Sequence, residues 1–366
     1  MSPTIVVAPD SFKGSASAAV IAEALSEGWS SVRPHDRVQR IPMADGGEGT
    51  LDAFEIAVPG SVRHPMTVLG PAGREVAASW LQLPNGIAVV ELAETSGLAH
   101  LPELAPLDAH TFGFGQAIAA ALAFGATGLL LALGGSSSTD GGVGALAALG
   151  AHFTDATGRP VRLGNRGLGT LARVDLSGLP PLPPDGVRIL SDVTNPLLGP
   201  SGSAAVFGSQ KGATPEQIVG LETGLTRLVR LLRGRPDAVG AGAAGGTGYG
   251  LLAWGAEFAP GAVAVGEALG LPALVAAADA VITGEGRFDS QSAAGKVPDY
   301  VSALAGVAHV PVLLAAGSIE APTDTFAAAV SLSDLAGGSA AAIADAPRWA
   351  RSAGAELARR FAALPR

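Results

Sequence analysis

Short apolar runs alternate with amphipathic stretches near both ends of the chain. Residues 4–8 form a β-branched run, and residues 15–31 carry apolar side chains at helical spacing with Ser15 or Ser17 as the N-cap. Strand–loop–helix units of this kind predict a sheet covered by helices. Further strands are predicted at 38–43, 279–283, 310–315 and 327–332, and a helix at 296–304.

The middle of the chain has a different pattern. Residues 61–69, 75–83 and 86–93 are rich in β-forming residues and separated by Gly and Pro turns, which predicts an antiparallel meander. Strands at 128–133 and 187–192 and helices at 111–124 and about 215–233 are also predicted. We therefore predict an α/β fold of two domains, in which an inserted mixed α/β domain interrupts a Rossmann-like doubly wound domain. The expected ranges are 1–60 with 265–366 for the Rossmann-like domain and 61–264 for the inserted one.

Length and composition agree with this division. A chain of 366 residues exceeds what one hydrophobic core usually supports, and 48% hydrophobic residues supply a large interior. The net charge of −9 argues against a nucleic-acid partner, and no basic amphipathic segment indicates a membrane surface. The absence of cysteine excludes disulfides and thiolate chemistry. Asp10 comes too early for a signal peptide, so we expect a cytoplasmic protein.

Lysine occurs at only three positions, Lys13, Lys211 and Lys296, and each lies beside a glycine in a polar turn. Nearly every other cationic side chain is arginine. A compact ammonium on a flexible stem offers what the planar guanidinium does not reproduce, and beside exposed backbone it suits a phosphate group. The three lysines thus suggest a phosphate-handling site, with codon bias and chance as the alternative.

Acidic side chains follow several of the predicted strands. They are Asp45, Asp140, Asp192, Glu285 and Asp289. Ligands of open α/β sheets bind at the carboxyl ends of the strands. In phosphoryl transfer, carboxylates hold Mg²⁺ and one of them takes the proton of the acceptor hydroxyl, while ammonium groups offset phosphate charge. For any one of these residues alone, a cap or an Asx-turn is the simpler interpretation.

Two further features are candidates for ligand binding. Residues 134–144 form a loop rich in Gly and Ser between a predicted strand and a predicted helix, where backbone N–H groups can bind an anion. Its candidate ligand residues are Gly134, Gly135, Ser136, Asp140 and Gly141. The alternative is a Gly-rich helix entry packed against a neighbour. Arg287 can clamp a substrate carboxylate or pair with Asp289 as scaffold.

Several segments together resemble the bacterial glycerate kinase type 1 family. They are residues 8–15, 43–50, 192–200, 207–213, 242–246 and 282–289, with Gly295-Lys296. They occur in the family's order over nearly the whole chain. The resemblance implies ATP-dependent phosphorylation of glycerate, commonly to 2-phosphoglycerate, by a Rossmann-like domain and an inserted domain with the active site in the cleft between them. Within these segments we take Ser11, Asn195, Gly245 and Gly246 as substrate- or nucleotide-binding residues.

The hypothesis assigns a role to each group. Lys13, Lys211 and Lys296 are expected to offset phosphate and substrate charge, Asp140 and Asp192 to bind Mg²⁺, and Asp45 to act as the base. The expected partners are ATP and glycerate, with a homodimer as an option. Two alternatives stay open: an oxidoreductase acting on a small hydroxy acid, which the glycine density allows, and a receptor that closes on a small acid.

Three positions depart from the family's usual sequence. His110 and Phe114 lie in a segment that is usually rich in threonine, and Thr139 replaces an asparagine. These differences bear on the acceptor pocket and the nucleotide contacts. The sequence does not fix which hydroxyl of glycerate is phosphorylated.

Overall fold

The structure is a computed structural model that describes residues 2–12, 14–289 and 296–363. It divides into two compact units. Unit 1 consists of Met1–Asp45, Asp52–Pro59 and Pro260–Arg366, and unit 2 of Gly46–Leu51 and Gly60–Ala259. The sequence places residues 46–51 with the first domain, whereas they pack within unit 2.

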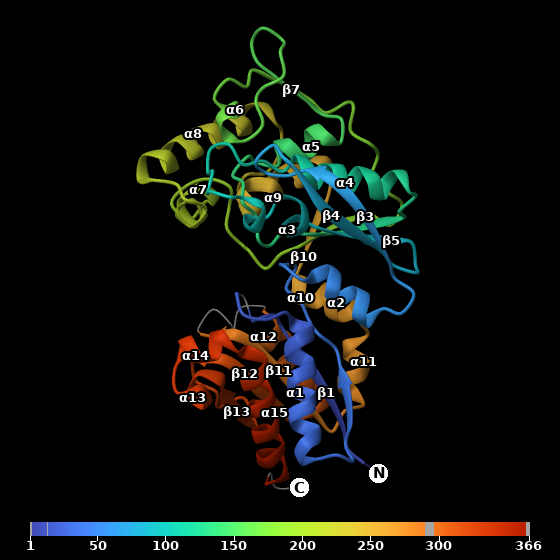
Figure 1. Cartoon of the computed structure of the whole chain (residues 1–366). Helices are drawn as coiled ribbons and strands as arrows, with labels where there is room; N and C mark the ends of the chain where they lie inside the picture. The colour runs from blue at the N-terminus through green and yellow to red at the C-terminus, as the bar shows by residue number, and fades with distance from the viewer. Residues whose placement is uncertain (1, 13, 290–295, 364–366) are drawn as a thin grey trace. The chain divides into compact units, whose positions relative to one another are not determined.

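Unit 1 is built on a parallel five-stranded sheet (Figure 1). Its strands are β1 (Thr4–Pro9), β2 (Arg37–Arg40), β11 (Ala280–Phe288), β12 (Val312–Ile319) and β13 (Ala328–Ser331). Their spatial order is β2-β1-β11-β12-β13. Numbered by appearance within the unit, this order is 2-1-3-4-5, which is the flavodoxin-like variant of the doubly wound sheet. In that arrangement the point where the strand order reverses lies between β1 and β11.

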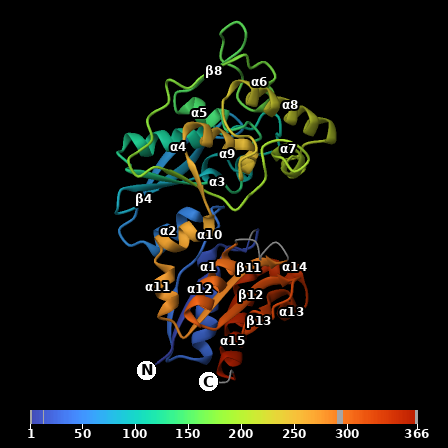
Figure 2. The same cartoon turned by 180° about the vertical axis from the view of Figure 1, so that it is seen from behind.

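Helices cover both faces of this sheet. The helices of unit 1 are α1 (Ala18–Val32), α10 (Gly261–Ala268), α11 (Leu271–Ala276), α12 (Val297–Ala308), α13 (Leu332–Ala336), α14 (Ser339–Ala344), α15 (Ala346–Ala362) and most of α2 (Thr50–Ala57), whose first two residues belong to unit 2. Helices α1 and α15 lie on one face and α12 on the other (Figures 1 and 2). Because both faces are covered, successive residues of β1 from Ile5 to Ala8 are all fully buried.

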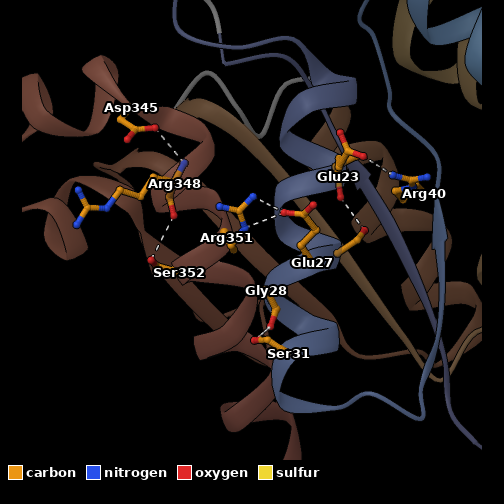
Figure 3. A network of polar contacts seen from close by, with 11 residues as sticks. Glu23, Glu27, Gly28, Ser31, Arg40, Asp345, Arg348, Arg351 and Ser352 are labelled. Carbon is orange, nitrogen blue, oxygen red and sulfur yellow. Dashed lines mark hydrogen bonds and ion pairs between the residues drawn. The ribbon is translucent and has the colours of Figure 1, made fainter.

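Helices α1 and α15 cross at close range because glycine lies at the contact. A Cβ atom on Gly28 would overlap the carbonyl oxygen of Arg351, and one on Gly354 would overlap that of Leu25. Glu27 and Arg351 form an ion pair beside this contact, in which the Nε atom of Arg351 donates to Oε2 of Glu27 at 2.7 Å (Figure 3). Glycine therefore sets the spacing of two helices that bury the same face of the sheet.

Unit 2 contains a mixed six-stranded sheet in the order β10-β9-β6-β5-β4-β3. The strands are β3 (Val62–Leu69), β4 (Glu75–Gln82), β5 (Ile87–Glu91), β6 (Gly128–Ala132), β9 (Val187–Leu190) and β10 (Glu257–Ala259). Strands β3, β4 and β5 form the predicted antiparallel meander. The remaining neighbours pair in parallel, so the loops after β5, β6 and β9 leave the same edge of the sheet. Strands β7 (His152–Thr154) and β8 (Arg173–Asp175) form a separate hairpin-like pair.

The helical elements of unit 2 pack around this sheet (Figures 1 and 2). They are α3 (Leu92–Ser96), η1 (Leu98–His100), α4 (Phe112–Ala123), α5 (Val143–Ala148), α6 (Asn165–Leu168), α7 (Ser203–Phe207), η2 (Ser209–Lys211), α8 (Pro215–Leu231) and α9 (Ala243–Trp254). Helix α8 starts with a capping box between Thr214 and Gln217, followed by Pro215. Among the described residues, no helix combines the length and apolar character that a membrane crossing requires.

The predicted α/β class is confirmed, and two strand ends were wrong. The strand expected at 279–283 continues to Phe288, because Gly284, Glu285, Arg287 and Phe288 pair with β12 instead of starting a loop. The strand expected at 38–43 ends at Arg40, although Met43 N still donates to Pro9 O at 2.9 Å. As a result, Glu285 and Arg287 lie within a strand, and Asp45 lies five residues beyond the end of β2.

Candidate active site

Unit 1 contains a cavity of about 390 Å³ at the carboxyl edge of its sheet. Residues after or near the ends of β1, β2, β11, β12 and β13 line it. Six of them were predicted from the sequence as site residues: Ser11, Asp45, Glu285, Arg287, Asp289 and Lys296. Asp10 joins them in the lining. Residues that are far apart in the sequence therefore meet in one cavity, at the edge where parallel sheets bind ligands.

The junction between β1 and β11 fixes the centre of this cavity. Asp10 N donates to Gly284 O at 2.8 Å, and the Thr283 hydroxyl donates to Ala8 O at 3.1 Å. Asp10 is 6% exposed, and its Oδ1 atom accepts from Ser11 N at 2.6 Å. A Cβ atom on Gly284 would overlap Ala315 O on the other side, so only glycine fits between the strands there.

Asp45 reaches the cavity through an extended segment that runs beside β1. Ile41 N donates to Val7 O at 2.8 Å, and Met43 N donates to Pro9 O at 2.9 Å. This pairing carries the chain past the end of β2 and leaves Asp45 half-buried in the cavity lining. A ligand in the cavity can therefore reach the carboxylate of Asp45.

Ion pairs link the charged groups of the cavity. Lys296 Nζ lies 3.6 Å from Oε2 of the buried Glu285. Arg287 pairs with Glu320 at 2.6 Å and with Asp289 at 3.4 Å, and its side chain is 62% exposed. Of the two interpretations for Arg287, the structure shows the pairing with Asp289. Glu285 and Arg287 lie within β11, not in a loop as the sequence suggested.

One end of the cavity is rich in apolar side chains and was not predicted. Its apolar side chains are Leu332, Ala342, Ile343 and Ala346, and Ser333 and Ser339 of the same helices line it as well. They come from α13, α14 and the start of α15, all after β13. This end could not be predicted from the sequence, because small apolar residues in short helices resemble ordinary core residues. Lys13, the remaining lysine of the N-terminal motif, lies outside the described residues.

The predicted Gly-rich loop of unit 2 leaves β6 beside the loop that follows β9. Leu133 N donates to Leu190 O, and Gly134 N donates to Gly46 O at 3.0 Å. A Cβ atom on Gly134 would overlap Cα of Gly47. The motif segment 46–51 thus packs against the Gly-rich loop. Gly135 is exposed, but Ser137, Ser138, Thr139 and Asp140 are each at most 1% exposed.

Asp140 lies at the centre of a buried hydrogen-bond network. Its carboxylate accepts from Thr111 N and Oγ1, both at 2.9 Å, from Ser138 Oγ at 3.4 Å, and from Gly142 N and Gly144 N at 3.1 and 3.2 Å. The side chain is 0% exposed. These five donors occupy both oxygens, and binding of Mg²⁺ or a ligand by Asp140 stays a prediction. Gly141 is buried as well, which agrees with the alternative of a packed helix entry.

Lys211 is also interior. It is 2% exposed, and its ammonium group donates to Ser138 O within the Gly-rich loop. Burial lowers the pKa of Lys211 to about 8, while the charge of Asp140 opposes this shift. Burial likewise lowers the pKa of His110, again opposed by Asp140. The structure therefore places the ammonium group of Lys211 against the backbone of the loop, and its role toward phosphate stays a prediction.

The glycines predicted at 245 and 246 pack onto the same loop. A Cβ atom on Gly245 would overlap Ser138 O, and Gly245 O accepts from Gly141 N at 3.0 Å. Both glycines are buried and have positive φ, as has Ala244 at φ 50°. Asn195 lies in the loop after β9, where its side chain donates to Ser201 O at 2.8 Å. Gly245 and Gly246 support the Gly-rich loop by packing against its backbone.

Two carboxylates of unit 2 remain to be placed. Asp192 is half-buried after the end of β9. Glu91, which the sequence did not single out, is 2% exposed at the end of β5, where it accepts from Gly49 N at 3.0 Å and Leu51 N at 3.1 Å. An acidic residue ending an apolar strand was the available signal. Within the described part of the chain, no group of three or more His, Asp or Glu side chains is arranged to hold a metal ion.

The fold defines a two-unit α/β protein. One unit has a flavodoxin-like sheet with a charged cavity at its switch point, and the other contains a Gly-rich loop. Residues 5–362 match the model of the glycerate kinase family. The chain is 43% identical over 325 residues to the glycerate 2-kinase of Escherichia coli K12, covering 86% of this chain and 85% of that one. It is 41% identical over 325 residues to the glycerate kinase of Bacillus subtilis 168, with the same coverage.

A solved structure agrees with these relatives. The crystal structure assigned as a glycerate kinase 2 of Salmonella typhimurium LT2 matches with a TM-score of 0.84 and 39% identity, over 99% of both chains. This chain belongs to the glycerate kinase family. The membership confirms the resemblance seen in the sequence and replaces the oxidoreductase and receptor alternatives.

Proposed function

We propose that this protein transfers the γ-phosphoryl group of ATP to glycerate and releases ADP, with the hydroxyl on C2 as the favoured acceptor. The observation that carries the proposal is the match to the E. coli glycerate 2-kinase, 43% identical over 86% of this chain. The cavity of unit 1 supports it, since Asp45, Glu285 and Lys296 meet there as the family motifs predict. An acceptor carboxylate and phosphates both need cationic partners, which these motifs contain.

Asp45 is the proposed general base. Its half-buried carboxylate lies in the lining of the cavity, at the end of the segment that runs beside β1. As the acceptor oxygen forms its bond to the γ-phosphorus, the hydroxyl proton passes to Asp45 and the bond to the ADP oxygen breaks. Lys296 and Lys13 are the proposed partners for phosphate and substrate charge. Lys211 holds the Gly-rich loop from within the protein.

Mg²⁺ is the proposed cofactor. Such an ion is usually bound by one or two carboxylates together with substrate phosphates and waters, so no complete cage of protein ligands is needed. Asp192 fits this requirement as a half-buried carboxylate after a strand end. Asp140 does not, because five donors occupy it. When bound, the ion supplies positive charge to the β- and γ-phosphates.

A coupled assay of ADP release tests the proposal. The wild-type protein, incubated with ATP and Mg²⁺, is expected to release ADP only when glycerate is added. Glycerol and lactate serve as acceptor controls, since the first lacks the carboxylate and the second lacks one hydroxyl. ADP release that does not depend on glycerate would contradict the proposed activity.

A further inference from the structure

The cavity of unit 1 reaches from one border of the sheet to the other. Its apolar end, made of Leu332, Ala342, Ile343 and Ala346, follows β13 at one border. Asp45 follows β2 at the opposite border. Four strand spacings of about 4.8 Å separate the two borders, or about 19 Å. The cavity is therefore long enough to distinguish the two ends of an extended ligand.

The charge of the lining is unequal along this length. Among the lining residues that the structure describes, four are carboxylates (Asp10, Asp45, Glu285 and Asp289) and two are cationic (Arg287 and Lys296). Both cations are already in ion pairs with carboxylates. The carboxylates of this lining suit a ligand portion that is uncharged and carries hydroxyl groups as donors.

The two substrates of a glycerate kinase differ in what they offer to such a cavity. Glycerate is a small anion without an apolar surface, so it gains nothing from the end that follows β13. The adenosine part of ATP is uncharged, with a flat base that buries well against aliphatic side chains. A cavity of about 390 Å³ lies within the range of about 300–1,000 Å³ that small-molecule sites occupy.

We propose that the apolar end of this cavity binds the adenine base of ATP, against Leu332, Ala342 and Ile343. The proposal rests on the proposed function. The ribose hydroxyls lie toward the carboxylates near the switch point between β1 and β11, and the phosphate chain runs toward β2. This direction places the far end of the nucleotide near Asp45, the proposed base, and the adenine at the border where no proton is transferred.

Two substitutions at the apolar end test the site with different chemistry. Ala342→Trp fills the space of the base in a position that is 4% exposed, and Ile343→Glu places a charge there in a position that is 59% exposed and tolerant of polar residues. Val307→Trp on α12 is the control, because Val307 is 85% exposed and does not line the cavity. Circular dichroism checks that each variant is folded.

Isothermal titration calorimetry with adenosine and with ATP measures the effect. Wild-type protein is expected to bind adenosine with a Kd on the order of 0.1 mM, from the binding energy per atom that is usual for a ligand of this size. Ala342→Trp and Ile343→Glu are expected to weaken both ligands about tenfold or more, and the control less than about twofold. The KM for glycerate stays unchanged in both variants.

The outcomes separate the inference from the activity. Unchanged binding of adenosine and ATP in both folded variants would overturn the adenine site, whatever the activity. A raised KM for glycerate with unchanged ATP binding would also overturn it and assign the apolar end to the acceptor. Adenosine binding that both variants lose, in a protein whose ADP release ignores glycerate, would support the site and refute the proposed function.

Discussion

The buried ammonium of Lys211 makes the stability of this protein depend on pH in a specific direction. Burial lowers its pKa to about 8, against an ordinary value of 10.5. The folded state thus disfavours the charged form, so the contribution is unfavourable below about pH 8 and disappears as the pH rises toward 10.5. A shift of about 2.5 units corresponds to about 3.4 kcal/mol, most of which is recovered between about pH 7 and pH 10.

The variant Lys211→Met isolates this effect from all other titrating groups. Urea unfolding of wild type and variant is measured at several pH values, and the difference in unfolding free energy is compared. We expect this difference to change by about 2.5 kcal/mol in favour of the wild type between about pH 7 and pH 10. Gln210→Met, an exposed neighbour in η2, is the control and should show no such change. A difference that stays flat across this range would refute the burial argument.

Three other substitutions test separate parts of the structure. Asp140→Ala leaves five buried donors without an acceptor. The unfolding free energy measured by urea titration should therefore fall by about 3–5 kcal/mol. A loss below about 1 kcal/mol would show that the network contributes little to stability. Gly354→Ala forces a Cβ onto Leu25 O and should lower the unfolding free energy by about 2 kcal/mol or more. Gly220→Ala, in open space on α8, should raise it by about 0.5–1 kcal/mol. Equal shifts in Tm for the two variants would contradict the close contact between α1 and α15. Asp45→Asn should reduce kcat by about 10²–10⁴ with little change in the KM for ATP, and full turnover would remove Asp45 as the base.

Much of the fold follows from local patterns that tertiary packing did not override. The β-branched run at Thr4–Pro9 and the meander of β3, β4 and β5 were predicted because apolar runs and turn residues bound them clearly. The end of β11 was missed because Gly284 and Gly286 resemble a loop in sequence. In the structure, Gly284 allows β11 and β12 to approach closely, which a pattern along one strand cannot show.

The site was predictable where accessibility did not matter. Asp45, Glu285 and Lys296 meet in the cavity, although Glu285 lies within β11 and Lys296 is the residue before α12. Asp140 and Lys211 have the same local signature, an ionisable residue in a turn rich in glycine, yet both are interior. The buried residues Asp140 and Lys211 differ from the residues of the cavity because the loop around them packs against segments distant in sequence, such as those of Thr111 and Gly245. Contacts of this kind cannot be predicted from the local pattern of a single sequence.

Proton-coupled phosphorus NMR of the reaction of wild-type protein with ATP, Mg²⁺ and glycerate tests the central claim most directly. We expect ATP to be consumed while a phosphomonoester signal grows, split into a doublet because the phosphate on C2 has one proton on the bonded carbon. A triplet would assign the transfer to the C3 hydroxyl, where two protons couple. The appearance of inorganic phosphate alone, with glycerate unchanged, would contradict the account.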